Sequence, residues 1–386
     1  MFRASEGFRK SRELLFKTGP DALVTCTIAS ISGNAEIGSV AAQTRCNGRK
    51  GLNWLGASQG HVQRNNRRMS LNTRIFFVTD VHGSEVCFNK FLSAATFYKP
   101  DVAILAGDIT GKLIVPIVQK PDSTYSIWWM GGEKTVRTEQ ELAETEKAIR
   151  NSGYYTYRTT ADVVANLESD KKNLDVLFTK VMVDNVERWV KLAEEKLKGT
   201  KVRVFISPGN DDRWEIDEAL KKSNLIVNPE LKVVNVDDHH EMITMGFTNH
   251  TPWNSPREFD EKYLGEKIDS MASQIKDMSK AIFNLHCPPI DTGIDSAPKL
   301  DETLKPVSMA GQVFMAPAGS SAVKEAIMKH QPLVGLHGHI HESRGTIPLG
   351  KTKCFNPGSE YGLGVLRGLI LNLSEKGIKS YMFTSG

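Results

Sequence analysis

From residue 73 onward the chain repeats one pattern, in which a short apolar run of strand length is followed by a polar loop. The apolar runs cover residues 75–78, 102–105, 202–206, 281–285 and 333–336. Ser84 stands where it would cap a helix running to about Tyr98, which Pro100 terminates. This alternation predicts an α/β protein that binds its ligands at the carboxyl ends of the strands. Residues 345–384 predict successive strands with short turns.

Residues 112–200 interrupt the alternation, because they separate two core strands by more than an ordinary connection. Residues 112–119 and 124–129 flank a Lys-Pro-Asp-Ser turn and predict a hairpin, and a helix is expected over residues 138–151. A longer helix over residues 161–197 has one broad apolar face, formed by Val163, Leu167, Leu174, Phe178, Val181, Val186, Trp189, Ala193 and Leu197. Packing against the core explains that face, whereas the location of the segment suggests a cap inserted over an active site.

The composition excludes several classes of protein. Of the 386 residues, 40% are hydrophobic and 24% are charged, which is ordinary for a globular protein. No apolar run approaches the roughly 20 residues of a membrane-spanning helix, so no membrane partner is expected. The five cysteines, at positions 26, 46, 87, 287 and 354, form no C-x-x-C pair, which argues against a zinc ribbon or a disulfide framework.

The formal net charge of +4 is unevenly distributed. Residues 1–68 hold 11 Lys and Arg against 4 Asp and Glu, which leaves 38 basic and 41 acidic residues in the remainder. The first segment lacks the apolar region of a secretory signal, and a cytoplasmic location is expected. Because Met69 leads directly into a strand pattern, residues 1–68 are interpreted as a non-native or over-extended start, and residues 69–386 as the working domain. A disordered tail and an organellar transit peptide remain as alternatives.

The loops that follow the predicted strands carry the candidate chemistry. In chain order they contain Asp80-Val81-His82, Gly107-Asp108, Gly209-Asn210-Asp211-Asp212, His286 and Gly338-His339-Ile340-His341. Taken singly, each of these loops is explained by an ordinary turn or a core histidine. Taken together, the five loops are expected to converge on one edge of a sheet. Imidazole and carboxylate groups are ligands of borderline divalent transition metals, and a carboxylate such as Asp108 can bridge two ions.

In this order the five motifs resemble the signature of the calcineurin-like metallophosphoesterases, which is D-x-H, G-D, G-N-(H/D), a lone His and G-H-x-H. The resemblance covers residues 73–384 and implies a four-layer α/β/β/α sandwich with a dinuclear metal centre. By the motif, one ion would be bound by Asp80, His82, Asp108 and His341, and the other by Asp108, Asn210, His286 and His339. Two ions of Mn, Fe, Zn, Co or Ni would suit this ligand set. The turn Asn356-Pro357-Gly358-Ser359 resembles the family's closing motif, and a plain strand-connecting turn accounts for it equally well.

The implied activity is metal-dependent hydrolysis of a phosphate ester, with a phosphodiester of a small or nucleotide-like substrate favoured. In this mechanism two cations lower the pKa of a bridging water, and the hydroxide attacks phosphorus in line with the leaving oxygen. Many members of the family carry His after the Asn of the third motif, where it assists the leaving group, but this chain has Asp211. Because an ionised carboxylate is a poor proton donor, His250 and His337 are alternative candidates for the acid.

The loop of residues 251–258 supplies candidate substrate contacts next to Asn210. Trp253 is a candidate wall and Arg257 a candidate phosphate contact, whereas Ser255 could instead cap a helix running to about Met278. The expected partner is a small-molecule phosphoester. A nuclease would need a basic face, which residues 69–386 do not supply on average. A phosphomonoesterase and a non-catalytic scaffold of the same fold are further alternatives, although a scaffold need not retain all seven metal ligands, and the oligomeric state is left open.

Overall fold

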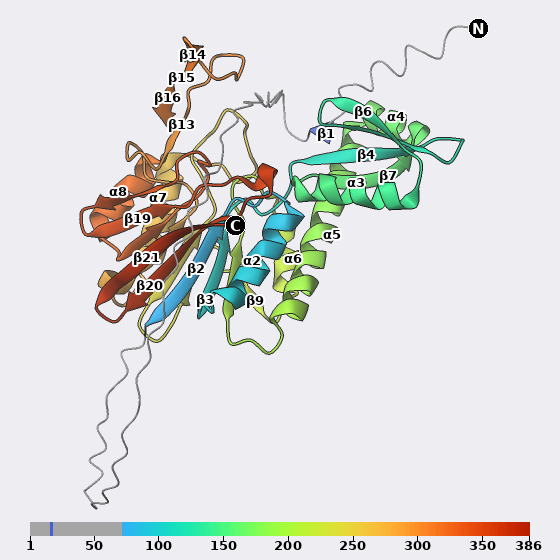
Figure 1. Ribbon diagram of the computed structural model, residues 1–386. Helices are drawn as coiled ribbons and strands as arrows, with labels where there is room; N and C mark the ends of the chain where they lie inside the picture. Colours follow the sequence, from blue (N-terminus) through green and yellow to red (C-terminus); the bar gives the residue numbers. More distant parts are fainter. Residues whose placement is uncertain (1–15, 18–71) are drawn as a thin grey trace, which may run out of the picture. The chain divides into compact units, whose positions relative to one another are not determined.

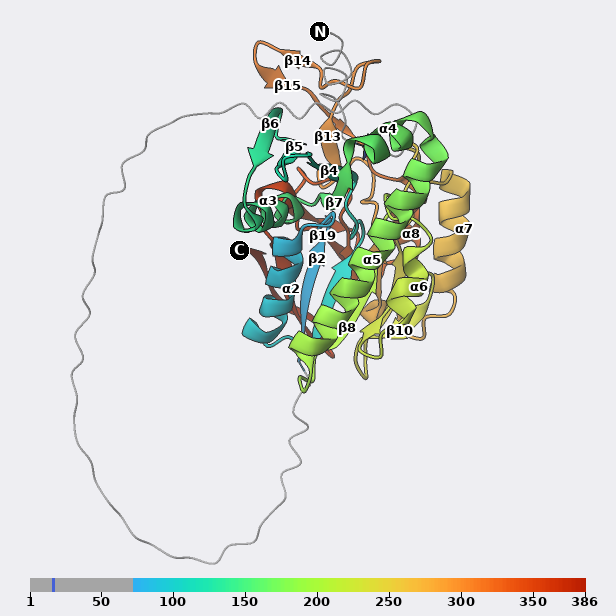
Figure 2. The same cartoon turned by 90° about the vertical axis from the view of Figure 1, so that its right-hand side faces the viewer.

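Strands and helices alternate along the chain in the computed structural model, which describes residues 16–17 and 72–386 (Figures 1 and 2). The interpretation of residues 1–68 as a leader lies outside the described residues, apart from the two-residue strand β1 (Phe16–Lys17). Two six-stranded sheets make up the body of the part that is described. The α/β class expected from the sequence is confirmed.

The first sheet has the strand order β21-β20-β2-β3-β8-β9. Its strands β2, β3, β8 and β9 are parallel, and β20 and β21 extend the sheet in antiparallel pairing. The bounds of these strands are Thr73–Thr79 for β2, Val102–Ala106 for β3, Arg203–Ser207 for β8, Ile226–Val227 for β9, Arg367–Ser374 for β20 and Gly377–Ser385 for β21. Because β2, β3 and β8 are parallel neighbours, the loops after them meet at one edge.

The second sheet has the order β10-β11-β12-β17-β19-β18. Its inner strands β11, β12, β17 and β19 are parallel, and an antiparallel strand closes each side. The bounds are Val233–Asn235 for β10, Glu241–Met245 for β11, Ile282–Leu285 for β12, Val334–Leu336 for β17, Gly345–Leu349 for β18 and Thr352–Asn356 for β19. The successive strands predicted after residue 345 are confirmed as β18 to β21.

Three apolar clusters hold the layers together. Ile75 and Phe77 of β2 pack with Ile282 of β12 between the two sheets, whereas their neighbours Phe76 and Val78 point to the opposite face, as strand alternation requires. That outer face is covered by α2 (Glu85–Phe97), α5 (Lys171–Leu197) and α6 (Ile216–Lys221), which lie in front of it in Figure 2. The outer face of the second sheet packs on α7 (Glu261–Ala272) and α8 (Ser321–His330). The order of layers is therefore helices, sheet, sheet, helices.

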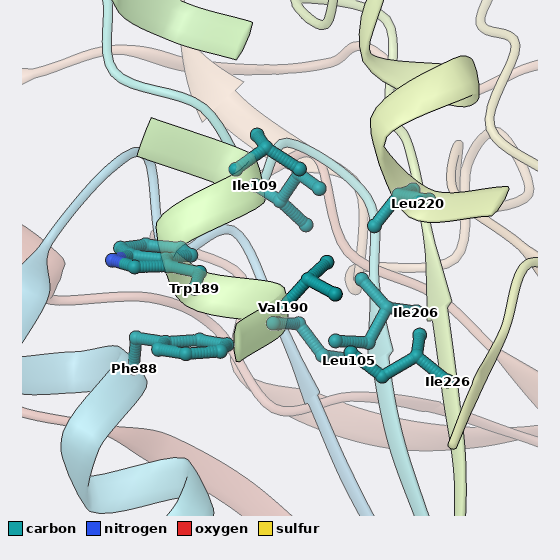
Figure 3. Close-up of a pocket in the computed structure, with 9 residues that line it drawn as sticks. Phe88, Leu105, Ile109, Trp189, Val190, Ile206, Leu220 and Ile226 are labelled. Carbon is teal, nitrogen blue, oxygen red and sulfur yellow. The ribbon is translucent and has the colours of Figure 1, made fainter. Parts of the chain in front are cut away.

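A small void lies between the first sheet and its helices (Figure 3). Its volume of about 10 Å³ is lined by apolar side chains only, including Phe88 of α2 and Trp189 of α5. These two rings are stacked with centroids 4.1 Å apart. An apolar space of this size does not hold water, so the void is a packing feature of the core.

Residues between β3 and β8 form a smaller sheet and three helices. The sheet contains β4 (Leu113–Gln119), β5 (Tyr125–Trp129), β6 (Gly132–Val136) and β7 (Tyr155–Thr160), and β1 pairs with β4. The predicted hairpin is the pair β4–β5, and the predicted helix of residues 138–151 is α3 (Glu139–Asn151), which Thr138 caps. Strands β6 and β7 were not predicted, although Tyr-Thr-Tyr-Arg-Thr-Thr in β7 has strong β propensity.

The prediction of one helix over residues 161–197 is wrong. The segment forms α4 (Ala161–Ser169) and α5, and Asp170 separates them by accepting a hydrogen bond from the backbone N–H of Lys172. Val163, which was placed on the apolar face, is 38% exposed, and its neighbour Val164 is buried instead. The run from Glu168 to Asn173 contains no apolar residue, so nothing in the core holds a continuous helix there.

The smaller sheet is tied directly to loops at the edge of the first sheet. The Tyr155 hydroxyl accepts a hydrogen bond from the N–H of Gly111 (2.8 Å), and Ser84 Oγ donates to the carbonyl of Asn151 (2.6 Å). Gly111 lies three residues after Asp108, and Ser84 lies two residues after His82. The segment therefore supports the candidate metal loops.

Three further features complete the described chain. Residues 296–317 form a projecting arm (Figure 1), with the paired strands β13 (Ser296–Pro298) and β16 (Met315–Pro317) and the paired strands β14 (Ser308–Met309) and β15 (Gln312–Val313). The two short 3₁₀ helices in the described residues are η2 (Met278–Lys280) and η3 (Tyr361–Leu363). The helix expected to follow Ser255 begins only at Glu261 and is capped by Asp260. Within residues 72–386, no helix is long and apolar enough to cross a membrane.

Candidate metal centre

The two sheets bring their polar loops to one place. Asp80 and His82 follow β2, Asp108 follows β3, Asn210 and Asp211 follow β8, His286 follows β12, and His339 and His341 follow β17. His341 Nε2 lies 3.4 Å from Asp80 Oδ1, and His286 Nε2 lies 3.5 Å from Asp108 Oδ2. His82 Nε2 lies 3.6 Å from the same Asp108 oxygen. Asp108 therefore lies between the two halves of the cluster.

Two groups of side chains in the cluster match the division expected from the sequence. Asp80, His82 and His341 form one group, and Asp108, His286 and His339 form another, with the candidate ligand atoms of each group within 4.8 Å of one another. A third group, His82, Asp108 and Asp211, was not expected as a ligand set. Asn210 is buried, and its Oδ1 has no hydrogen-bond partner, so it is free to act as a ligand.

The donor atoms fit divalent cations. Buried nitrogens of two of the histidines, His82 Nδ1 and both ring nitrogens of His286, have no hydrogen-bond partner. His82 Nε2 and His341 Nε2 face each other at 3.1 Å, although two such nitrogens can share only one proton. Unpaired buried polar atoms are costly, and a bound cation would pair with one nitrogen of each ring. A set of imidazole, carboxylate and amide donors is suited to Mn, Fe, Co, Ni or Zn.

Glycines in the motifs allow the loops to approach closely. A Cβ placed on Gly107 would lie 1.9 Å from Nδ1 of His286, and one on Gly338 would lie 2.4 Å from Oδ2 of Asp80. Four candidate ligands also adopt the left-handed backbone conformation, with φ of 53° at Asp80, 40° at His82, 42° at Asp108 and 66° at His339. Non-glycine residues reach this region at a cost, and such strain is concentrated at functional sites.

The electrostatic environment favours bound cations. Burial lowers the pKa of His339 to about 3, and burial together with the charge of Lys112 holds the pKa of His82 well below its ordinary value, so both imidazoles are in the neutral form that binds metals. Burial alone would lower the pKa of His286, but the charges of Asp108 and Asp80 outweigh it and raise that pKa to about 9. The carboxylates thus attract positive charge to this point.

Asp212 holds two of the metal loops together. It is fully buried, and its Oδ2 accepts hydrogen bonds from the N–H groups of Gly209 (2.8 Å) and Ile109 (3.0 Å). Its Oδ1 accepts from the N–H (2.9 Å) and the hydroxyl (2.5 Å) of Thr110. The turn that carries Asp108 is thereby fixed to the turn that carries Asn210.

The turn at Asn356 connects the remaining loops. Asn356 Nδ2 donates to the carbonyls of Gly338 (3.3 Å) and Ile340 (3.0 Å), which flank His339. Ser359 Oγ donates to the carbonyl of Asp80 at 2.6 Å. The turn therefore does more than connect strands, because it links the D-x-H loop to the G-H-x-H loop.

Asp211 is partnered by a residue that sequence reasoning missed. Lys112 Nζ lies 2.5 Å from Asp211 Oδ2, and Ser255 Oγ donates to Asp211 Oδ1 at 2.8 Å. Desolvation raises the pKa of a buried carboxyl, but the charge of Lys112 and the hydrogen bonds from Lys112 and Ser255 outweigh it, and the pKa of Asp211 lies below its ordinary value. Asp211 is therefore ionised and unsuited to donate a proton. Lys112 carried no motif, and its position directly after Gly-Asp-Ile-Thr-Gly was the one signal available.

The prediction that Arg257 contacts phosphate is wrong. Its side chain is fully buried, stacks over Trp214 with 4.3 Å between the guanidinium carbon and the ring centroid, and donates to Asp217 Oδ1 at 2.8 Å. Its Nε donates to the carbonyl of Asp212. Arg257 therefore anchors the loop of residues 251–258 to the third motif.

The other two candidate acids differ in burial and in their partners. His337 is fully buried, its Nδ1 lies 2.8 Å from the carbonyl oxygen of Leu285, and burial lowers its pKa to about 4, which favours the neutral imidazole. A catalytic role for His337 stays a prediction. His250 is exposed, with Nδ1 4.0 Å from Glu258. Trp253 is 40% exposed on the loop that Ser255 ties to Asn210, so its contact with substrate stays a prediction.

Comparisons with known proteins find only low sequence similarity. No family profile matches the chain. The uncharacterized protein MJ1162 of Methanocaldococcus jannaschii is 25% identical over 158 residues, which are 40% of this chain and 64% of that protein. The chain thus covers less than two thirds of this relative's length.

Solved structures with similarity over most of the chain have low sequence identity. TT1561 of Thermus thermophilus is 11% identical, with 82% of this chain and 99% of that chain covered and a TM-score of 0.46. A novel archaeal phosphodiesterase is 13% identical, with 81% and 99% covered and a TM-score of 0.33. The phosphoesterase YfcE of Escherichia coli is 11% identical, with 80% and 98% covered and a TM-score of 0.28.

The arrangement of the strands and helices of this chain defines its fold. Two stacked mixed sheets lie between helices, and the five motifs meet where the parallel strands of both sheets end. This mixed α/β arrangement agrees with the fold class expected from the sequence.

Proposed function

We propose that this protein is a metal-dependent phosphoesterase that hydrolyses a phosphodiester of a small or nucleotide-like substrate. One observation carries the proposal: four loops from two sheets bring four histidines and two carboxylates into two adjoining groups, with buried donor atoms left unpaired. Structural histidines normally have hydrogen-bond partners, so such unpaired atoms favour a metal centre. Two adjoining ligand groups with Asp108 between them favour two ions.

The chain's own residues would bind and orient the reacting groups. Asp80, His82, Asp108 and His341 would hold one ion, and Asp108, Asn210, His286 and His339 the other. Paired divalent ions supply a nucleophile at neutral pH and stabilise charge on phosphoryl oxygens. Asp212 and Asn356 hold the ligand loops in register, so little reorganisation accompanies binding.

The preference for a diester is inferred from Asp211. An ionised carboxylate at this position cannot protonate a leaving alkoxide, and the lowered pKa of His337 favours its neutral imidazole. Substrates with a good leaving group are therefore favoured. A diester also brings one negative charge fewer than a monoester toward the carboxylate of Asp211.

The test is a matrix of metals and substrates on the full chain. The protein is stripped with EDTA, reloaded with Mn²⁺, Co²⁺, Ni²⁺, Zn²⁺ or Fe²⁺, and assayed with bis(p-nitrophenyl) phosphate, p-nitrophenyl phosphate, cyclic nucleotides and DNA. Turnover of the diester that depends on metal and is lost in Asp108→Asn is expected. The matched control is Asp184→Asn, because Asp184 is an exposed carboxylate paired with Lys180 on α5 and should not affect turnover.

Two results would contradict the proposal. Folded protein that binds no metal with micromolar or better affinity would exclude the metal centre. Metal-loaded protein without turnover of any phosphoester would exclude the enzyme and favour a scaffold. Salt-sensitive binding and cleavage of DNA would shift the substrate class to nucleic acid.

A further inference from the structure

Lys112 lies at the rim of the candidate metal centre with its charge directed at it. Its Nζ is 2.5 Å from Asp211 Oδ2, and Asp211 Oδ2 is 4.0 Å from His82 Nδ1. The backbone N–H of Asp211 donates to Asp108 Oδ1 at 2.9 Å. The ammonium group is thus connected to two candidate ligands through Asp211, by its carboxylate to His82 and by its backbone N–H to Asp108.

The backbone of Lys112 is fixed on both sides. The preceding Gly111 donates its N–H to the buried hydroxyl of Tyr155, and the following residue, Leu113, begins β4. Asp211 is fixed as well, because Ser255 Oγ bonds its second carboxylate oxygen and also accepts from Asn210 Nδ2 at 2.9 Å. Both partners are therefore held before any ligand arrives.

The pair is more open to solvent than the candidate ligands His82 and Asp108. The Lys112 side chain is 47% exposed and that of Asp211 is 21% exposed, whereas His82 and Asp108 are 1% and 3% exposed. Tyr361 borders the same rim, with its ring centroid 4.6 Å from that of His82. An anion that reaches the metal ligands from solvent arrives beside this ammonium group.

We propose that Lys112 contacts a non-bridging phosphoryl oxygen of the bound substrate, and that Asp211 and Ser255 are positioning residues for it. The inference rests on the proposed function and extends it, because it names Lys112 as the group that binds the anionic part of the substrate. It also assigns Asp211 a role that requires no proton transfer. The smaller inserted sheet would then supply substrate affinity, because β4 begins directly after Lys112.

The test measures affinity for inorganic phosphate and steady-state kinetics on the full, metal-loaded chain. Lys112→Met removes the charge, Lys112→Arg keeps it, and Lys112→Met/Asp211→Asn removes both charges of the pair. Lys201→Met is the control for net charge, because Lys201 is exposed and lies just before β8, at the opposite end of that strand from Asp211. Metal content and melting temperature are measured for every variant.

Lys112→Met should raise the phosphate dissociation constant and KM by about tenfold or more, the cost of losing a hydrogen bond to a charged group, with a smaller effect on kcat. The loss should be larger for p-nitrophenyl phosphate, a dianion, than for bis(p-nitrophenyl) phosphate. Lys112→Arg should recover part of the affinity, and Lys201→Met should bind phosphate like the wild type. Metal content should not change in any of these variants.

Several outcomes would overturn the inference. Unchanged phosphate affinity in Lys112→Met would show that the side chain does not meet the anion. Wild-type phosphate affinity in Lys112→Met/Asp211→Asn would mean that Lys112→Met alone acts by leaving the Asp211 charge unpaired, and that Lys112 makes no contact with the anion. Loss of metal in Lys112→Met would make its role structural. If the wild type binds phosphate through Lys112 but turns over no ester, the proposed function fails while this inference stands.

Discussion

The strongest test of the site's construction is Asp212→Asn. The carboxylate of Asp212 is fully buried and accepts four hydrogen bonds, two at each oxygen. An asparagine amide can present its oxygen to only one of these donor pairs, and its NH₂ group then faces two buried donors. Two bonds to a charged acceptor are lost, at about 1.5–3 kcal/mol each, which predicts a loss of about 3–6 kcal/mol in unfolding free energy.

Urea unfolding at pH 7 in the presence of EDTA measures this loss without a contribution from bound metal. Thr110→Val gives a graded comparison, because it keeps the shape of the buried side chain and removes only the hydroxyl that donates to Asp212 at 2.5 Å. Its expected cost is about 1–2 kcal/mol. Asp184→Asn, on the surface of α5, should leave the unfolding midpoint unchanged.

Asp212→Asn should also weaken metal binding, because the turns of Asp108 and Asn210 are no longer held together. Isothermal titration with Mn²⁺ measures this effect on protein that is still folded. A variant with the stability and metal affinity of the wild type would refute the reasoning that this carboxylate fastens the two loops.

Three further predictions concern other parts of the molecule. Burial raises the pKa of Glu230 from 4.5 to about 8, so the folded state binds a proton between these values and loses stability as pH rises through them. Glu230→Gln should reduce the slope of unfolding free energy against pH over this window by up to about 1.4 kcal/mol per pH unit. A slope equal to that of the wild type from pH 5 to 8 would contradict this. Gly107→Ala should abolish binding at the His286 half of the centre, measured as metal content of the folded protein, because the new Cβ would lie 1.9 Å from the imidazole. Trp189→Ala should cost about 3–5 kcal/mol in urea unfolding, because it removes the ring stacked on Phe88; a midpoint near that of the wild type would exclude this packing.

Much of the fold could be predicted from local patterns. Each core strand is a short apolar run, and helices α2 and α3 begin next to Ser84 and Thr138, which cap them as their residue types favour. The break at Asp170 and the strands β6 and β7 were missed. Whether polar segments continue a helix or join a sheet depends on the surfaces they pack against, and apolar periodicity does not report those surfaces.

The sequence by itself determined the candidate ligand set, because Asp, Asn and His in five ordered motifs each follow a predicted strand. Only the tertiary structure showed that these strands belong to two sheets, whose loops meet at one place. Only the tertiary structure decided the roles of the neighbouring charged residues. Arg257 was expected to contact phosphate and Lys112 carried no motif, but Arg257 is buried against Asp217 and Lys112 is half exposed beside Asp211. The role of a charged side chain depends on its partner and on its exposure to solvent, and segments far apart in the chain determine both.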